Sequence, residues 1–375
     1  MGKDCSAGGI ASIAMGDNTD ASGNHSVMLG FASLISTPFE SPGYAGGDYS
    51  FSVGRNNIAG GAGSVAMGGC CFEDPVANPP SRCEALGDGS FAMGNGCQAL
   101  GNNSIAMGYW TKAVGDFSFA MGESNGGVGQ ASSGIAKGLC SFSMGEDCSA
   151  NGNFSMAFGR HCRTGEDASG ALAMGLDCSA GGIASVSMGE DTNAIGDYSF
   201  AMGFETDASG NYSVAMGQDC SANGVNSFAM GLTSTAGGRE SVAMGRRVAA
   251  AGDYSVAMGD ESVADASGAV AMGVDCSAGH HGDFASGVRC IANGSNLNPA
   301  IAMGSDCSAN GAGAISMGLA CGSDCGPGNC AIAMGCDSTA KVNGSISIGV
   351  FNHATAQGAV AIGVGCNAAG EDSVA

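Results

Sequence analysis

The cysteines are the residues whose type and spacing give this chain its clearest prospect of chemistry. The sequence has 375 residues and 18 cysteines, and twelve of these lie four residues after a recurring methionine site. Other repeats carry Thr or Ser at the same position, for example Thr192 and Ser234. A position shared by small residues is typical of a structural slot, in which Cys packs as a small apolar group. We therefore expect a column of mostly reduced, buried thiols.

The twelve cysteines of this column are Cys5, Cys71, Cys97, Cys148, Cys162, Cys178, Cys220, Cys276, Cys290, Cys307, Cys321 and Cys366. Neighbours in the column are expected one strand spacing apart, about 4.8 Å, and parallel side chains at that distance are wider apart than a disulfide prefers. Most of the column should therefore stay unlinked.

Cysteines outside this register lie in or beside insertions and have a second interpretation. They include Cys70, Cys83, Cys325, Cys330 and Cys336. In an oxidising compartment, a disulfide between Cys83 and Cys71 (or Cys70), and another among Cys321, Cys325 and Cys330, are alternatives to free thiols. These cysteines lack the paired Cys-x-x-Cys spacing of a zinc site, so we expect no metal centre there.

Acidic residues and histidines give weaker signals. Pairs such as Glu146-Asp147, Glu190-Asp191 and Asp260-Glu261 could stack and attract Ca²⁺, but the glycine-rich nonapeptide of calcium-binding β-rolls does not recur, which favours solvated turns. The pair His280-His281 is expected to be a solvated loop. No nucleophile with a base and an orienting group, and no phosphate-binding glycine loop, can be recognised. We expect no cofactor and no enzymatic activity.

The element that must position all these residues is a 14-residue repeat, written most regularly between Asp177 and Gly273. Each repeat reads Ser-(Val/Phe)-Ala-Met-Gly, followed by a variable corner and then Ala-x-Gly. The register runs through 24 such sites, of which 18 carry Met. Fourteen residues suffice for two short strands and two tight corners, which form one turn of a solenoid. The sequence thus predicts an all-β parallel β-roll, one continuous array over residues 1–375.

The alternation within the repeat predicts which side chains face inward. Apolar residues recur at i and i+2 around a small residue, the period of a strand whose two sides differ. We expect the Val/Phe and Met positions to fill the interior and the intervening alanines, such as Ala201 and Ala215, to face outward. The predicted core ladder is Met188, Met202, Met216, Met230, Met244, Met258 and Met272.

A glycine follows every methionine site and is expected to form a corner, because a positive φ or a crowded backbone excludes a Cβ. These corner glycines are Gly189, Gly203, Gly217, Gly231, Gly245, Gly259 and Gly273. A second glycine, eight residues after the methionine site, should form the other corner.

Insertions interrupt the repeat at a few places. They fall at about 31–47, 72–89 and 123–137, with smaller ones near 160–170, 288–299 and 321–330. Insertions into solenoid repeats leave as loops and often carry binding specificity, although neutral decoration is the alternative interpretation.

The repeat resembles the head repeat of trimeric autotransporter adhesins, the YadA-like head, with Met where that family usually has Ile. The stretches Ser345-Ile346-Ser347-Ile348-Gly349 and Ala359-Val360-Ala361-Ile362-Gly363 match the family form directly. The resemblance implies a left-handed parallel β-roll, a homotrimer, and adhesion to host or matrix molecules from the cell surface or the extracellular space. Within these 375 residues we recognise no heptad stalk and no membrane-anchor sequence of the family, and we expect them, if present, to lie outside this segment.

Charge and hydropathy narrow the range of partners. The formal net charge is −22, which disfavours nucleic acid as a partner. No stretch approaches the length of a membrane span, so we expect no membrane insertion by this segment. Both ends are in phase with the repeat, which suggests a segment of a longer chain. The leading hypothesis is a non-enzymatic, cysteine-rich adhesive rod that presents loops to host, matrix or neighbouring surfaces; the alternative is a subunit of an extracellular or virion filament without a dedicated receptor.

Overall fold

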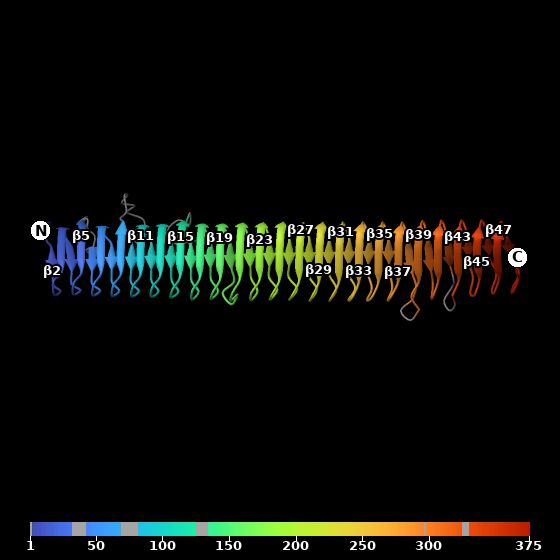
Figure 1. Cartoon of the computed structure of the whole chain (residues 1–375), viewed down its shortest axis with the longest axis horizontal. Coiled ribbons are helices and arrows are strands. Elements are labelled where there is room, and N and C mark those ends of the chain that lie inside the picture. Colours follow the sequence, from blue (N-terminus) through green and yellow to red (C-terminus); the bar gives the residue numbers. More distant parts are fainter. Residues whose placement is uncertain (1, 32–42, 69–81, 125–133, 296–297, 325–329) are drawn as a thin grey trace, which may run out of the picture. The chain divides into compact units, whose positions relative to one another are not determined.

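A computed structural model describes residues 2–31, 43–68, 82–124, 134–295, 298–324 and 330–375. The chain divides into two compact units, Met1–Asp197 and Tyr198–Ala375, here called the N-terminal and C-terminal units. Both are parallel β-solenoids, and the described residues contain only strands and turns. Each solenoid turn has two strands, as the repeat predicted, but one is long and the other short (Figure 1).

The long strands have four or five residues in all turns except the first, which has two. In the N-terminal unit they are β1 Gly2–Lys3, β3 Ile13–Asp17, β5 Val27–Phe31, β7 Phe51–Arg55, β9 Val65–Gly68, β11 Phe91–Asn95, β13 Ile105–Tyr109, β15 Phe119–Glu123, β17 Phe142–Glu146, β19 Met156–Arg160, β21 Leu172–Leu176 and β23 Val186–Glu190. In the C-terminal unit they are β25 Phe200–Phe204, β27 Val214–Gln218, β29 Phe228–Leu232, β31 Val242–Arg246, β33 Val256–Asp260, β35 Val270–Val274, β37 Phe284–Val288, β39 Ile301–Ser305, β41 Ile315–Leu319, β43 Ile332–Cys336, β45 Ile346–Val350 and β47 Val360–Val364.

The short strands have two or three residues. In the N-terminal unit they are β2 Ser6–Ala7, β4 Thr19–Ala21, β6 Gly43–Ala45, β8 Ile58–Ala59, β10 Glu84–Ala85, β12 Gln98–Ala99, β14 Lys112–Ala113, β16 Ile135–Ala136, β18 Ser149–Ala150, β20 Arg163–Thr164, β22 Ser179–Ala180 and β24 Asn193–Ala194. In the C-terminal unit they are β26 Asp207–Ala208, β28 Ser221–Ala222, β30 Thr235–Ala236, β32 Ala249–Ala250, β34 Val263–Ala264, β36 Ser277–Ala278, β38 Ile291–Asn293, β40 Ser308–Asn310, β42 Gly322–Asp324, β44 Thr339–Ala340, β46 His353–Ala354 and β48 Asn367–Ala368.

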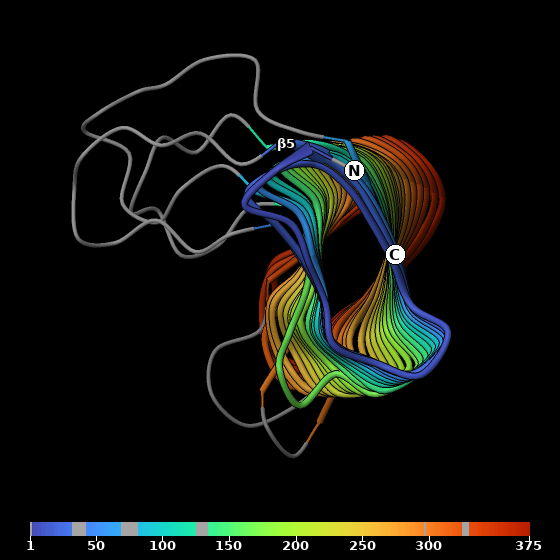
Figure 2. The same ribbon diagram turned by 90° about the vertical axis from the view of Figure 1, so that its left-hand side faces the viewer.

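Neighbouring turns pair in parallel and in register, one repeat apart. Between β27 and β29, for example, Val214 pairs with Phe228 and Met216 with Met230. Equivalent residues of successive turns therefore stack in columns, and each column repeats one chemical type along the solenoid. Viewed end-on, each turn within a unit follows nearly the path of its neighbour, slightly rotated against it (Figure 2).

The expected orientation of the long strands was wrong. The alanines at their second position, such as Ala201, Ala215 and Ala229, are 0% exposed and form the interior. The predicted core methionines, Met188, Met202, Met216, Met230, Met244, Met258 and Met272, lie on the outer face and are only half-buried, with Met272 37% exposed. The physical reason is the width of the turn: the interior between a five-residue and a two-residue strand has room only for Ala, Ser, Thr and Cys, with few exceptions.

One large interior side chain shows that the volume of the interior is limited. Met28 takes the place of the interior alanine in β5 and is fully buried. A Cβ on Gly43, where most turns carry Thr, Cys or Ser, would overlap the Met28 methyl group. The larger side chain is thus accommodated because its neighbour has none, as close packing requires.

The glycine after each methionine also lies elsewhere than expected. Gly203 is the fourth residue of β25, inside the strand, with a φ of 135°. The corner itself comes two residues later, at Glu205, whose φ is 52°. A Cβ on Gly203 would overlap the carbonyl oxygen of Gly217 in the next turn, so glycine is required by the stacking distance as well as by its φ.

Candidate functional site

The outer face of the long strands carries an apolar surface. From β3 to β47 the first residue of every long strand is apolar, and the third is apolar except at Ser286. These side chains are half-buried or exposed, and Ile362 reaches 57% exposure. Within the N-terminal unit the rings of Phe119 and Phe142 stack on this face with centroids 4.6 Å apart. We call this surface, in each unit, the Val/Met face.

A face of this kind is unusual on a monomer. The two columns continue from turn to turn without a charged residue, while the fifth strand position is often charged, as at Glu190, Arg246 and Asp260. Contiguous exposed apolar surface bordered by polar residues is typical of a protein–protein interface. The apolar residues of this face recur visibly in the sequence, but the expected strand orientation placed them in the interior.

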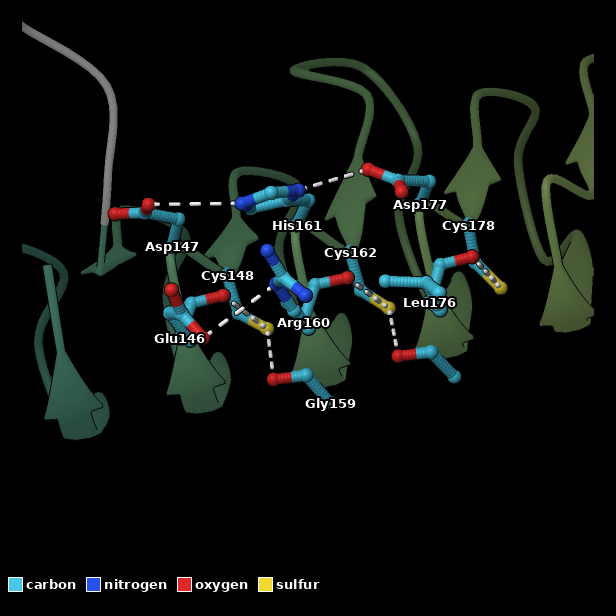
Figure 3. Close-up of polar contacts among 11 residues, drawn as sticks. Glu146, Asp147, Cys148, Gly159, Arg160, His161, Cys162, Leu176, Asp177 and Cys178 are labelled. Carbon is cyan, nitrogen blue, oxygen red and sulfur yellow. Dashed lines mark hydrogen bonds and ion pairs between the residues drawn. The ribbon is translucent and has the colours of Figure 1, made fainter. Parts of the chain in front are cut away.

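The second candidate site is the interior slot just before each short strand, where the cysteine column lies. Each described cysteine from Cys83 to Cys321 in this slot points its Sγ at a glycine carbonyl oxygen of the next turn. The distances are 3.1 Å from Cys148 to Gly159 and 3.1 Å from Cys162 to Gly175, both drawn in Figure 3. The widest is 3.3 Å, from Cys220 to Gly231 and from Cys276 to Gly287. The thiol therefore donates a hydrogen bond to an inward-facing carbonyl.

The serines and asparagines found in this slot donate the same hydrogen bond. Ser234 donates through Oγ to the carbonyl of Gly245 at 2.9 Å. Asn57 donates through Nδ2 to the carbonyl of Gly68 at 2.8 Å. Because a buried carbonyl without a donor is costly, the slot favours a small donor, which explains why Cys, Ser and Asn occupy equivalent turns.

The structure places the column cysteines as follows. Buried free thiols in the slot include these cysteines of the predicted column: Cys148, Cys162, Cys178, Cys276, Cys290, Cys307 and Cys321. Cys83, expected to be out of register, also lies in the slot, 3.1 Å from the Gly94 carbonyl. The insertion before it leaves between long strand and slot, so Cys83 takes the position that counting from Met67 gave to Cys71. Cys71, Cys70 and Cys325 lie outside the described residues, and Cys330 is an exposed free thiol.

Burial and mutual contact shift the pKa values of these thiols. Burial raises the pKa of Cys290 to about 11. The hydrogen bond with Cys162, together with burial, raises the pKa of Cys178. The hydrogen bond from Cys83 lowers the pKa of Cys97 to about 7. The pKa of a stacked thiol therefore depends on the thiols in the neighbouring turns.

A charged cluster lies on the surface beside Cys148 and Cys162. His161 Nδ1 is 2.9 Å from an Asp177 carboxylate oxygen, and Nε2 is 3.7 Å from Asp147 (Figure 3). Glu146, Asp147 and His161 present ligand atoms within 4.8 Å of one another. However, Arg160 Nε lies 3.5 Å from Glu146, so the cluster neutralises itself in part. His161 lies one repeat after Asp147 in the sequence, so the register by itself stacks the two side chains.

The acidic and amide residues of the second corner have a structural role. Asp253 accepts a hydrogen bond from the backbone N–H of Arg239, 2.8 Å away in the preceding turn. Asp116 does the same for Asn102, at 2.8 Å. The aromatic residue that follows is exposed with a positive φ, and the rings of Tyr198 and Tyr212 stack with centroids 5.1 Å apart. The second corners of successive turns thus form a row on the surface that includes exposed aromatic residues.

The insertion near 288–299 has an anchor that the sequence did not reveal. Asp283 is fully buried where most turns have Ser or Ala. Its carboxylate accepts from the backbone N–H groups of Ala300 at 2.7 Å, His280 at 2.8 Å and Gly294 at 3.0 Å. An interior carboxylate at the base of an insertion is the signal that could have identified it.

Comparison with known families identifies the repeat. A model of the YadA head domain repeat matches residues 7–31, 45–69, 99–122, 180–206, 194–219, 222–247, 250–275 and 354–375. Comparison with curated proteins finds no match. In the part of the chain that the structure describes, no helix has the length and apolar character needed to cross a lipid bilayer.

Proposed function

This chain belongs to the YadA head family, and on that premise we propose that it is the head of a non-enzymatic, homotrimeric surface adhesin. The proposal places three copies of the chain with their Val/Met faces against one another. It places the corners and insertions outward, toward a host, matrix or neighbouring surface. It also places the chain at the cell surface.

The observation that carries this proposal is the Val/Met face. Burying apolar surface contributes roughly 25 cal/mol per Å², and a continuous face of Val, Ile, Phe and Met offers such surface at every turn. The net charge of −22 would oppose association unless the contact surface were free of charge, which this face is. Symmetric assembly from one repeated patch is the usual way to bury it.

The trimer can be tested by replacing two stacked methionines of the face. We expect the purified chain to have three times the monomer mass by light scattering after size exclusion, and the double variant Met216→Glu, Met230→Glu to dissociate. Gln218→Glu adds a charge next to the face, at an exposed position of β27, and serves as the control. A monomeric parent chain, or dissociation of the control as well, would contradict the assignment of the interface.

Adhesion requires a separate experiment. The purified chain is applied to immobilised matrix proteins and to whole cells, alongside a variant lacking residues 72–81 and a control shortened in the small insertion at 166–167. Loss of binding in the first variant only would assign specificity to the larger insertion, and equal binding by all three would remove that role. Electron micrographs that show continuous filaments instead of discrete trimers would favour a structural fibre.

A further inference from the structure

Cysteines fill the interior slot in consecutive turns at three places. They form a pair, Cys83 and Cys97; a triplet, Cys148, Cys162 and Cys178; and a quartet, Cys276, Cys290, Cys307 and Cys321. The hydrogen-bonding requirement of the slot does not explain these runs, because Ser or Asn satisfies it equally well in other turns.

Register fixes the spacing within each run. In the quartet, the residues that follow the cysteines are paired in parallel: Ser277 with Ile291, then Ile291 with Ser308. The cysteines themselves are therefore one strand spacing apart, about 4.7–4.9 Å. In the triplet, the three sulfurs point the same way along the interior (Figure 3). All nine cysteines of the three runs are at most 1% exposed.

This spacing suits a bridging ion better than a covalent bond. A disulfide joins sulfurs about 2.05 Å apart, so linking neighbours would require the stacked turns to distort. Metal–thiolate bonds are about 2.3 Å long, and two of them in line span about 4.6 Å, close to the strand spacing. A cation can thus lie between two sulfurs of neighbouring turns while the backbone stays in register.

The row also selects the kind of cation. Each gap between neighbouring turns is bordered by two sulfurs, whereas zinc and iron–sulfur clusters require four ligands. Soft thiolates select Cu⁺ among the biological metals, and monovalent ions of this type accept two sulfurs in line. We propose that the three runs bind soft monovalent cations, Cu⁺ or its analogue Ag⁺, each ion bridging the sulfurs of two neighbouring turns.

Binding is an exchange of protons for cations, without oxidation or reduction. In an isolated pair, two S–H bonds break, two sulfur–metal bonds form and two protons leave to solvent. In the quartet, three cations replace four protons, which leaves one net negative charge. The glycine carbonyls that now accept the S–H groups, such as those of Gly304 and Gly318, would then face the cations with their negative ends.

The test is a titration of the reduced full chain with Ag⁺, and with Cu⁺ under anaerobic conditions, counting bound ions by native mass spectrometry. Cys290→Ser interrupts the quartet and should lower the count by two per chain. Serine is tolerated there because Ser234 and Ser262 occupy the same slot. Cys220→Ser is the matched control, since Cys220 lies in the slot between Thr206 and Ser234 and has no cysteine neighbour.

A count lowered by two in Cys290→Ser and unchanged in Cys220→Ser, with X-ray absorption showing two sulfur ligands per ion, supports the proposal. Equal counts for both variants and the parent chain would overturn it. So would a count abolished by replacing the exposed Cys140 and Cys330 with Ser, or cation uptake accompanied by loss of the β circular-dichroism signal.

Discussion

At the scale of single residues, the repeat is governed by two requirements of the interior. One is volume: from β3 to β47 the second position of each long strand is filled by Ala or Ser, except for the larger Met28, which lies beside Gly43. The other is hydrogen bonding: in most turns the slot residue donates to an inward-facing glycine carbonyl of the next turn, although Val248 shows that the slot also holds an apolar side chain. Together they explain why this chain has so many small residues and why its large apolar residues lie outside.

The volume requirement predicts opposite effects for neighbouring residues. Ala215→Met overfills the interior and should lower the free energy of unfolding by about 1–3 kcal/mol or more. Met216→Ala removes a half-buried side chain from the Val/Met face and should weaken the trimer while affecting the isolated roll less. Urea unfolding of each variant, followed by circular dichroism at a concentration where the parent chain is monomeric, checks this. If Met216→Ala were the less stable variant, the result would show that Met216 lies in the interior and would contradict the orientation described here.

Hydrogen bonding from the slot predicts that a donor there adds to stability beyond packing, although the slot also holds the apolar Val248. Cys220→Val leaves the carbonyl of Gly231 without its donor and should cost about 1–3 kcal/mol. Cys220→Ser keeps a donor and should be nearly neutral. The difference between the two unfolding free energies is the measurement, and equal losses would show that only packing matters in the slot.

The raised pKa of Cys290 predicts a dependence of stability on pH. Its pKa lies at about 11 in the folded chain against an ordinary value of 9.0, so the folded state favours the protonated thiol. This stabilising contribution is complete below pH 9 and is lost as the pH rises toward 11. Across that window the unfolding free energy of Cys290→Ser should fall less than that of the parent chain, and parallel pH profiles would contradict the assignment.

At the scale of the element, the long strand is defined by the glycine at its fourth position. Gly203 and its equivalents allow the turns to approach to one strand spacing, while the chain bends two residues later at a residue of positive φ such as Glu205. Each large insertion begins after a long strand. The residue that occupies the next interior slot comes from the sequence that follows the insertion. Strand register is thereby kept, because the strands pair the same way on either side of each insertion.

We expect that adding one methyl group at the strand glycine causes a severe loss of stability. Gly203→Ala places a Cβ on the carbonyl of Gly217 and should cost well over 4 kcal/mol or prevent folding, because the backbone itself must move. Gly237→Ala adds the same group where the nearest atom is 3.8 Å away, and should be tolerated. Expression level, circular dichroism and thermal unfolding of the two variants provide the comparison.

At the scale of the whole molecule, each turn contacts only its neighbours, so each unit should fold on its own. Stability of a solenoid is approximately a sum of nearest-neighbour terms. We expect residues 198–375, expressed separately, to keep the β spectrum of the parent chain and to unfold with a smaller dependence on urea concentration. A fragment that is disordered under native conditions would show that cooperativity extends through the entire chain.

The sequence by itself determined the period, the parallel stacking, the column of cysteines and the family, because each depends on what recurs every 14 residues. It did not determine which side of the long strand faces inward, since alternation separates two faces without ranking them. The tertiary structure decided that question through the width of the turn, which admits Ala201 but not Met202. It also decided that Cys83 lies in the interior slot, because only the folded path shows where an insertion leaves the roll and where it returns.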